Sequence, residues 1–203
     1  MEANTKMLAT EIKIQKAFIQ LTQTIGFDKL TIQSLCQAAK ISRGTFYLHY
    51  VDKYDLLTHY EDEIVENINE IFKRYQKPQL NSAVDETDKE HNAFFQLFKY
   101  LYRQRKLASL LLNGHTTQLV IKVKHLIESV LVQSQATTSE TTIDFPVPFA
   151  KEIVSQGILD LVTFWLNQKS PLDPNHAYQI FQQSRSLTPA QLVQIIIKKR
   201  NPF

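Results

Sequence analysis

Residues 31–50, TIQSLCQAAKISRGTFYLHY, decide the fold of the N-terminal part of the chain. They contain two short helical patterns separated by a turn. Thr31 is placed to cap the first helix and Ser42 the second, because hydroxyl side chains accept hydrogen bonds from the free N–H groups at a helix start. Phe46 and Tyr50 lie one turn apart on the second helix, so both should face inward. The stretch therefore predicts a helix-turn-helix.

The second of these helices divides its side chains between two faces. With Phe46 and Tyr50 inward, the outer face and its margin carry Arg43, Gly44, Thr45, Tyr47 and His49. A helix that enters the major groove of DNA needs such a face, since Arg can pair with guanine, Thr can touch a thymine methyl or a phosphate, and Gly allows close approach. This face is a candidate DNA-reading surface.

Helical patterns continue on both sides of this stretch. A helix ending at Gly26 precedes it, and Asp52 and Asp55 are placed to cap a helix that follows and runs to about Tyr75. A polar stretch from Pro78 to about Glu90 suggests a boundary. Beyond it, further helices are expected over 87–102, up to 113–114, over 119–130, after Pro148, after Pro174 and after Thr188.

The composition supports the same fold class and limits the function. The chain has 203 residues with only 4 Gly and 7 Pro, and no alternating strand pattern, so we expect an all-α protein of about nine or ten helices. A net charge of +3 is too small to indicate DNA binding by itself. The apolar stretch 150–166 is interrupted by charged residues, and the single Cys36 suits a reducing compartment. We expect a cytoplasmic protein without membrane contact, cofactor or metal.

The N-terminal sequence resembles a known family over roughly residues 8–57. The resemblance rests on Gly26-Phe27, Thr31-Ile32, Lys53, Leu56-Leu57 and the run AAKISRGTFYLHY at 38–50. These residues are similar to the N-terminal domain of the TetR/AcrR (tetracycline-repressor-like) regulators. The resemblance implies a homodimer that places two recognition helices in successive major grooves of a palindromic operator, and a repressor that a small-molecule effector releases from DNA. A minority of the family activates transcription.

The resemblance also assigns roles to single residues. It implies phosphate contacts by Thr31, Tyr47 and Lys53, and groove contacts by Arg43, Gly44, Thr45 and His49; Ser42, the cap of the recognition helix, is placed on the same surface. It divides the chain into a DNA-binding domain (1–50), a connecting helix (51–77) and an effector-binding and dimerisation domain (78–203).

Two further sets of residues are expected in the C-terminal part. Aromatic residues could line an effector pocket, although such residues at helical spacing are usually core: Phe94, Phe98 and Tyr102. A dimer interface is expected on one later helix: Val154, Gly157, Ile158, Leu161 and Trp165. No catalytic motif is found, so we expect no enzyme. A protein-binding adaptor and a small helical enzyme remain as alternatives.

Overall fold

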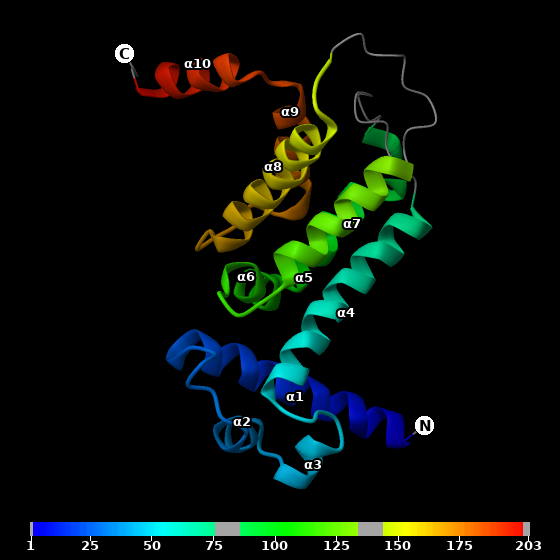
Figure 1. The fold of residues 1–203 in the computed structure, drawn as a ribbon, viewed down its shortest axis with the longest axis vertical. Helices are drawn as coiled ribbons and strands as arrows, with labels where there is room; N and C mark the ends of the chain where they lie inside the picture. The colour runs from blue at the N-terminus through cyan, green and yellow to red at the C-terminus, as the bar shows by residue number, and fades with distance from the viewer. Residues whose placement is uncertain (1, 76–85, 134–143, 201–203) are drawn as a thin grey trace.

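The computed structural model describes residues 2–75, 86–133 and 144–200, which form ten α-helices, one 3-10 helix and no strand. The expected all-α fold is confirmed. Figure 1 shows the N-terminal helices at one end of the molecule, a larger group at the other end, and α4 running between them. The boundary expected near Pro78 and nearly all of the loop expected at 136–144 lie outside the described residues.

The N-terminal helices are α1 (Glu2–Ile25), α2 (Ile32–Ala39) and α3 (Arg43–Tyr47). Their ends follow the predicted local chemistry. Gly26 ends α1 with a φ of 81°, a conformation that suits glycine. Thr31 accepts a hydrogen bond from the N–H of Ser34, and Ser42 accepts one from the N–H of Thr45. The helix-turn-helix is thereby confirmed.

Helix α4 (Lys53–Arg74) belongs to both parts of the molecule. Near its start, the ring of the buried Tyr60 lies 5.2 Å from that of Phe18 on α1, within the N-terminal core. Further along, Ile64 and Ile68 face α5 (Ala93–Arg103) and α7 (Leu119–Gln133). The buried stripe continues to Phe72, and the half-buried Ile71 beside it packs against the core.

The remaining C-terminal elements surround α4, α5 and α7. They are η1 (Glu86–His91), α6 (Arg105–Asn113), α8 (Val147–Asn167), α9 (Pro174–Ser186) and α10 (Pro189–Arg200). The helix expected over 87–102 is two elements, because the side chain of Asn92 accepts hydrogen bonds from the N–H groups of Phe94 and Phe95 and so begins α5. Within the described ranges, no helix is long and apolar enough to cross a membrane.

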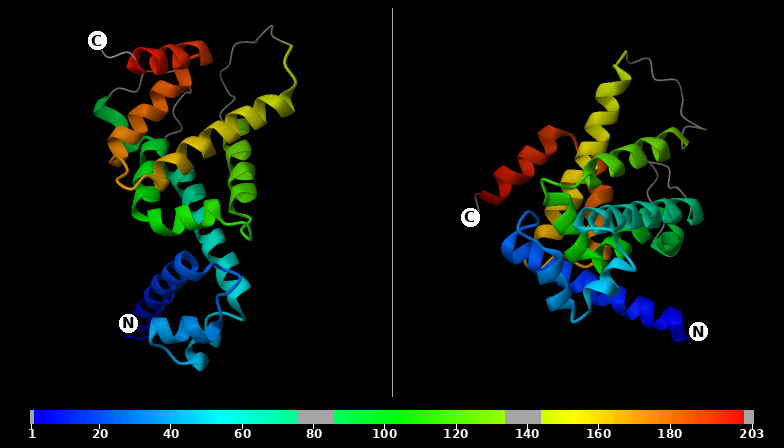
Figure 2. Two further views of the ribbon diagram at one scale, coloured as in Figure 1. Left: turned by 90° about the vertical axis from the view of Figure 1, so that its left-hand side faces the viewer. Right: turned by 60° about the horizontal axis from the view of Figure 1, so that its bottom comes forward.

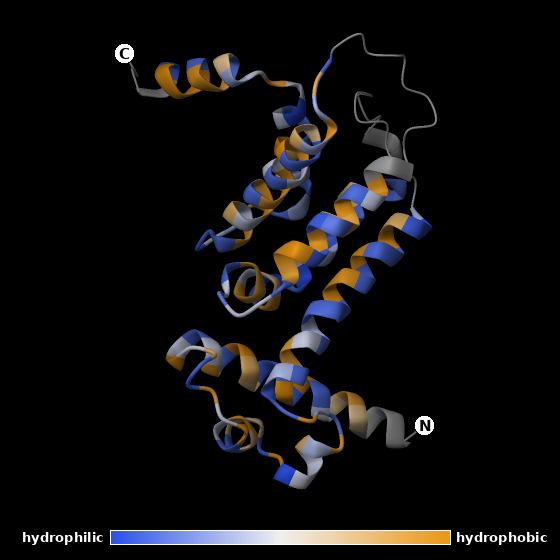
Figure 3. Ribbon diagram, in the orientation of Figure 1, coloured by the Kyte–Doolittle hydropathy of each residue, from blue (hydrophilic) through white to orange (hydrophobic). Residues whose placement is uncertain are grey.

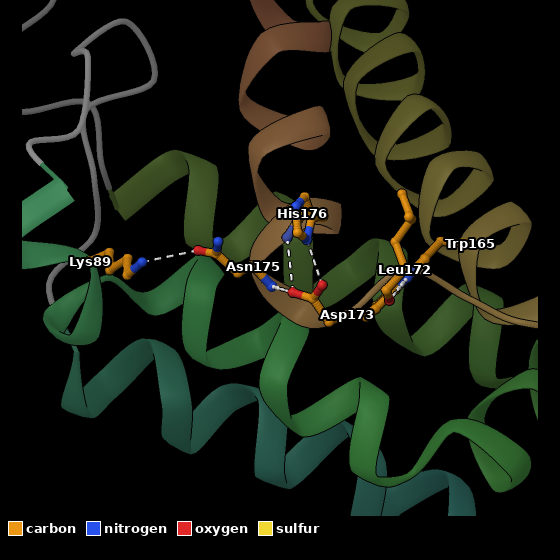
Figure 4. A network of polar contacts seen from close by, with 6 residues as sticks. All are labelled: Lys89, Trp165, Leu172, Asp173, Asn175 and His176. Carbon is orange, nitrogen blue, oxygen red and sulfur yellow. Dashed lines mark hydrogen bonds and ion pairs between the residues drawn. The ribbon is translucent and has the colours of Figure 1, made fainter.

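Polar contacts fix the connection between α8 and α9 and the start of α9 (Figure 4). The indole Nε1 of Trp165 donates to the carbonyl of Leu172 at 2.9 Å. Asp173 caps α9 by accepting hydrogen bonds from the N–H groups of the next turn, and Lys89 of η1 donates to the side chain of Asn175 at 3.1 Å. Helices α8 and α9 therefore form an outer layer over α5, α6 and α7 (Figure 2).

Candidate nucleic-acid interface

The recognition helix α3 is anchored by one face and open on the other. Phe46 is completely buried, and its ring lies 5.7 Å from that of the buried Tyr50. Arg43, Gly44 and Tyr47 are exposed on the other side. The division of faces expected from the sequence is therefore present.

The turn between α2 and α3 sets the angle of the recognition helix. Lys40 adopts a left-handed conformation with φ of 54°, which costs a non-glycine residue about 1 kcal/mol. The turn offsets this cost, since the N–H of Ile41 donates to the carbonyl of Cys36 at 3.0 Å and the Ile41 side chain packs against the core. Exposed Arg43 donates across the turn to the side chain of Gln33 on α2 at 3.2 Å. Gln33, which sequence reasoning missed, thus shares the surface of Arg43.

Two expected contact residues are already engaged within the domain. Thr45 is half-buried, and its hydroxyl lies 2.8 Å from that of Ser42. The His49 side chain is only 12% exposed, and its Nδ1 lies 4.0 Å from a carboxylate oxygen of Glu11 on α1. His49 therefore faces α1 more than it faces the surface formed by Arg43 and Gly44.

Glu11 ties the recognition helix to α1 and α4. It accepts hydrogen bonds from the hydroxyls of Tyr50 at 2.5 Å and Tyr60 at 3.0 Å. Burial, and next the nearby Glu11 carboxylate, raise the pKa of both phenols, so they stay protonated as donors. No motif in the sequence pointed to this clamp, because its members are far apart along the chain.

Lys53 closes the loop between α1 and α2. Its Nζ donates to the carbonyls of Phe27 at 3.1 Å and Asp28 at 3.0 Å, and lies 4.9 Å from the Phe27 ring centre. A lysine ammonium has three donors, so one remains for another partner. At the start of α4, Asp52 accepts hydrogen bonds from the N–H groups of Tyr54 and Asp55, as predicted for a cap.

Nothing in the fold of this chain explains why residue 44 is a glycine. A Cβ at this position would meet only the Ser42 hydroxyl oxygen, at an ordinary 3.6 Å, and the φ is not positive. Glycine weakens a helix by up to about 1 kcal/mol relative to alanine. Within the described structure, no contact and no backbone angle requires glycine at this position.

An apolar cavity of ≈ 60 Å³ lies in the C-terminal part, between α4, α5, α7 and α8. Its walls are entirely aliphatic or phenyl side chains: Ile64, Ile68, Phe72, Phe94, Leu97, Leu101, Ala108, Leu112, Leu119, Val123, Leu126, Ile127, Val130, Ile158, Leu159 and Val162. Of the expected pocket residues, only Phe94 lines it. Phe98 packs against Trp165, and Tyr102 stacks on the same indole.

The expected dimer residues on α8 lie on different faces. Trp165 is 5% exposed and packs within its own chain, so it belongs to the core. Val154 is half-buried, and Ile158 and Leu161 pack against the core. Gly157 is exposed, and so are two large apolar neighbours on its side of the helix, Ile153 and Phe164. The outer face of α8 thus has a different register from the expected one.

In the described part of the chain, no group of His, Cys, Asp and Glu side chains could hold a metal ion.

Comparison with solved structures shows a shared fold at low sequence identity. A TetR transcriptional regulator from Streptococcus agalactiae 2603V superposes with a TM-score of 0.60 at 19% identity, covering 91% of this chain and 98% of that one. NalD, the secondary repressor of the MexAB-OprM multidrug efflux pump in Pseudomonas aeruginosa, gives 0.62 at 16% identity, covering 91% and 96%. The fatty acid degradation regulator FadR from Bacillus halodurans gives 0.59 at 19% identity, covering 87% and 94%.

At the sequence level, no curated protein matches the chain. Residues 6–60 match the family model described as bacterial regulatory proteins, tetR family. The matched residues include α2, α3 and the first turns of α4, which form the helix-turn-helix and its anchor. Residues 6–60 thus carry a helix-turn-helix domain of the kind found in bacterial regulatory proteins of the tetR family, and the whole chain shares the fold of such regulators.

Proposed function

We propose that the chain is a repressor that binds a palindromic operator as a homodimer and is released by a small apolar effector. The exposed, unexplained glycine on α3 carries the DNA-binding part, because Gly44 leaves room for a DNA backbone or base beside Arg43. The functional regions in this scheme are residues 1–50 for DNA, 51–77 for the connection and 78–203 for effector and dimerisation. In this scheme the chain is a regulator and not an enzyme. It acts in the cytoplasm, because that is where its operator DNA lies.

We assign base contacts and phosphate contacts to different exposed residues of this surface. Arg43, held by Gln33, is placed for base contact, and the exposed hydroxyls of Thr31 and Tyr47 are placed for phosphates. Thr45 and His49 contribute at the margin. Lys53 has one donor left for a phosphate while it holds the loop.

A gel-shift titration on DNA that flanks the chain's own gene tests this assignment. Arg43→Ala should weaken specific binding by about 1–3 kcal/mol and relax sequence preference at one position. Tyr47→Phe, which keeps the ring and removes only the hydroxyl, should weaken all sequences alike. Equal behaviour of the two variants would refute the division, and no shifted species at low salt would refute DNA binding. A reporter that rises on adding the protein would indicate an activator.

The dimer is supported by the outer face of α8. A Cβ at the exposed Gly157 would have no neighbour within 4 Å, so the fold of one chain does not require glycine in the middle of this helix. A second helix that packs closely against this position would require glycine there. The exposed side chains of Ile153 and Phe164 would enlarge the contact, and with α9 of each chain the two α8 helices would form a four-helix bundle. Phe164→Glu should give a monomer in sedimentation experiments, whereas a dimer of unchanged affinity would exclude this face.

The effector is assigned to the apolar cavity. A ligand that contacts only aliphatic and phenyl walls is itself apolar in the part that enters. Binding of the fluorescent probe N-phenyl-1-naphthylamine tests this. Val123→Phe, which fills the cavity, should weaken probe binding at least about tenfold, equal to 1.4 kcal/mol. Ile121→Phe, on the exposed side of the same helix, serves as the matched control. Equal probe affinity in both variants would place the effector elsewhere.

A further inference from the structure

Helix α10 extends away from the rest of the molecule (Figure 1), and most of its turns carry the colour of hydrophobic residues (Figure 3). All side chains from 191 to 198 are exposed. Five of them are large and aliphatic, with 42 to 60% of their surface accessible: Leu192, Val193, Ile195, Ile196 and Ile197. The polar residues Gln191, Gln194 and Lys198 follow one another at spacings of three and four, so they form a single narrow stripe.

Such a helix needs a covering surface. An isolated helix of this length is marginal in water, and most helical stability comes from burying an apolar face. A contiguous exposed apolar patch on a soluble domain marks an interaction site. Within the described residues, no other element packs along α10.

The direction of α10 indicates what covers it. Only Leu187 and Thr188 separate it from α9, so its start is fixed beside the α8 and α9 layer. In Figures 1 and 2, α10 leaves on the side away from α4 and α7. The layer itself also exposes large apolar side chains, namely Ile153 and Phe164 on α8 and Ile180 on α9.

We infer that α10 is an arm that packs on a second copy of this chain, across the α8 and α9 layer of the partner. In a twofold dimer formed by that layer, an arm that points away from its own body reaches the other protomer, and both arms make the same contact. The inference rests on the dimer proposed above and extends it, because it makes the C-terminal helix part of the interface.

The test measures the dimer dissociation constant of the full chain by sedimentation over a range of concentrations. Ile196→Glu, at the most exposed aliphatic position of the arm, should raise this constant at least about tenfold, since each 1.4 kcal/mol is tenfold and the change occurs twice per dimer. Gln194→Glu introduces the same charge on the polar stripe and should change it less than about twofold. Circular dichroism of both variants checks that the remaining helices are intact.

A second measurement follows the arm directly. With Cys36→Ser removing the only cysteine, Ile196→Cys should react with a thiol reagent at least about tenfold more slowly above the dimer dissociation constant than below it. If Ile196→Glu leaves the dimer dissociation constant unchanged, the proposal that α10 packs on the partner is refuted. Loss of binding to phosphatidylglycerol–phosphatidylcholine vesicles in that variant, with the dimer unchanged, would overturn it in favour of a membrane surface. If the wild type is a monomer throughout, the proposed dimer fails and the arm fails with it.

Discussion

Replacing Glu61 with alanine should loosen the contact between α4 and α7. Glu61 is 3% exposed, although it is a carboxylate on the helix that joins the two parts of the molecule. Its Oε1 accepts a hydrogen bond from the N–H of Gln118, just before α7, at 2.7 Å, and its Oε2 lies 2.9 Å from Nζ of Lys122. One side chain therefore holds the start of α7 against α4.

The loss of unfolding free energy in Glu61→Ala follows from the interactions that Gln118 and Lys122 lose. Without Glu61, the N–H of the exposed Gln118 loses a hydrogen bond to a charged group, which is worth about 1.5–3 kcal/mol and which water replaces only in part. Lys122 loses one carboxylate but keeps Asp62 at 2.7 Å and is 24% exposed, so its share stays below the 3–5 kcal/mol of a fully broken buried pair. We expect about 3 kcal/mol in total, equal to a fall in Tm of about 6–12 °C for a domain of this size.

Urea and thermal unfolding followed by circular dichroism measure this difference. Asp62→Asn is the matched control, because Asp62 binds the same lysine from a side chain that is 62% exposed; it should cost less than about 1 kcal/mol. Glu61→Gln keeps an acceptor for Gln118 and should lie between the two. If Glu61→Ala is no more destabilising than Asp62→Asn, the hydrogen bond to α7 does not hold the helices together and the reasoning is wrong.

Three substitutions and one labelling experiment test other contacts of the helix-turn-helix and its anchor. Tyr60→Phe removes the hydrogen bond to Glu11 and should lower the free energy of unfolding by about 1 kcal/mol, measured in urea. Gly26→Ala should cost about 1–2 kcal/mol in the same assay because its φ is positive, although space for a Cβ is open. Ser42→Ala removes the cap of α3 and should cost about 1 kcal/mol; hydrogen exchange should show faster amide exchange at the start of α3, and equal exchange would argue against the cap. Burial raises the pKa of the Cys36 thiol, and the positive charge of Arg43 opposes this only in part. At pH 8 a thiol reagent should therefore label Cys36 more slowly in the folded protein than in the protein unfolded in urea, and labelling of the folded protein should become faster only at higher pH.

The features that the sequence predicted correctly are local. Caps at Thr31, Ser42 and Asp52, and the glycine at 26, act within three residues of themselves, so neighbouring residues suffice to identify them. The start of α5 was placed wrongly because Asn92 interrupts a stretch whose apolar spacing alone suggested one helix.

The features that the sequence missed depend on how distant helices cross. Helix α8 is apolar around most of its circumference, so periodicity could not say that Trp165 faces the core while Phe164 faces outward. The aromatic residues of α5 have the same ambiguity, and only Phe94 reaches the cavity. Glu11 and Glu61 look like ordinary surface carboxylates in the sequence, because their partners are 39 to 61 residues away.

The small size of the cavity connects effector binding to movement of α4. A cavity of ≈ 60 Å³ is far smaller than the roughly 150 Å³ that admits benzene, so an effector must separate its walls. Glu61 holds the lower end of α4 to α7, which makes the far end at Phe72 the easier one to move. With a rise of about 1.5 Å per residue, a shift of about 2 Å at Phe72 turns α4 about Glu61 and displaces Lys53 by about 1.5 Å in the opposite direction. Tyr50, which follows the recognition helix, packs on His59 of α4, so under the proposed function opening the cavity shifts the recognition helix. We predict that Glu61→Ala uncouples the two ends of α4, so that a ligand in the cavity no longer alters operator affinity in a gel shift.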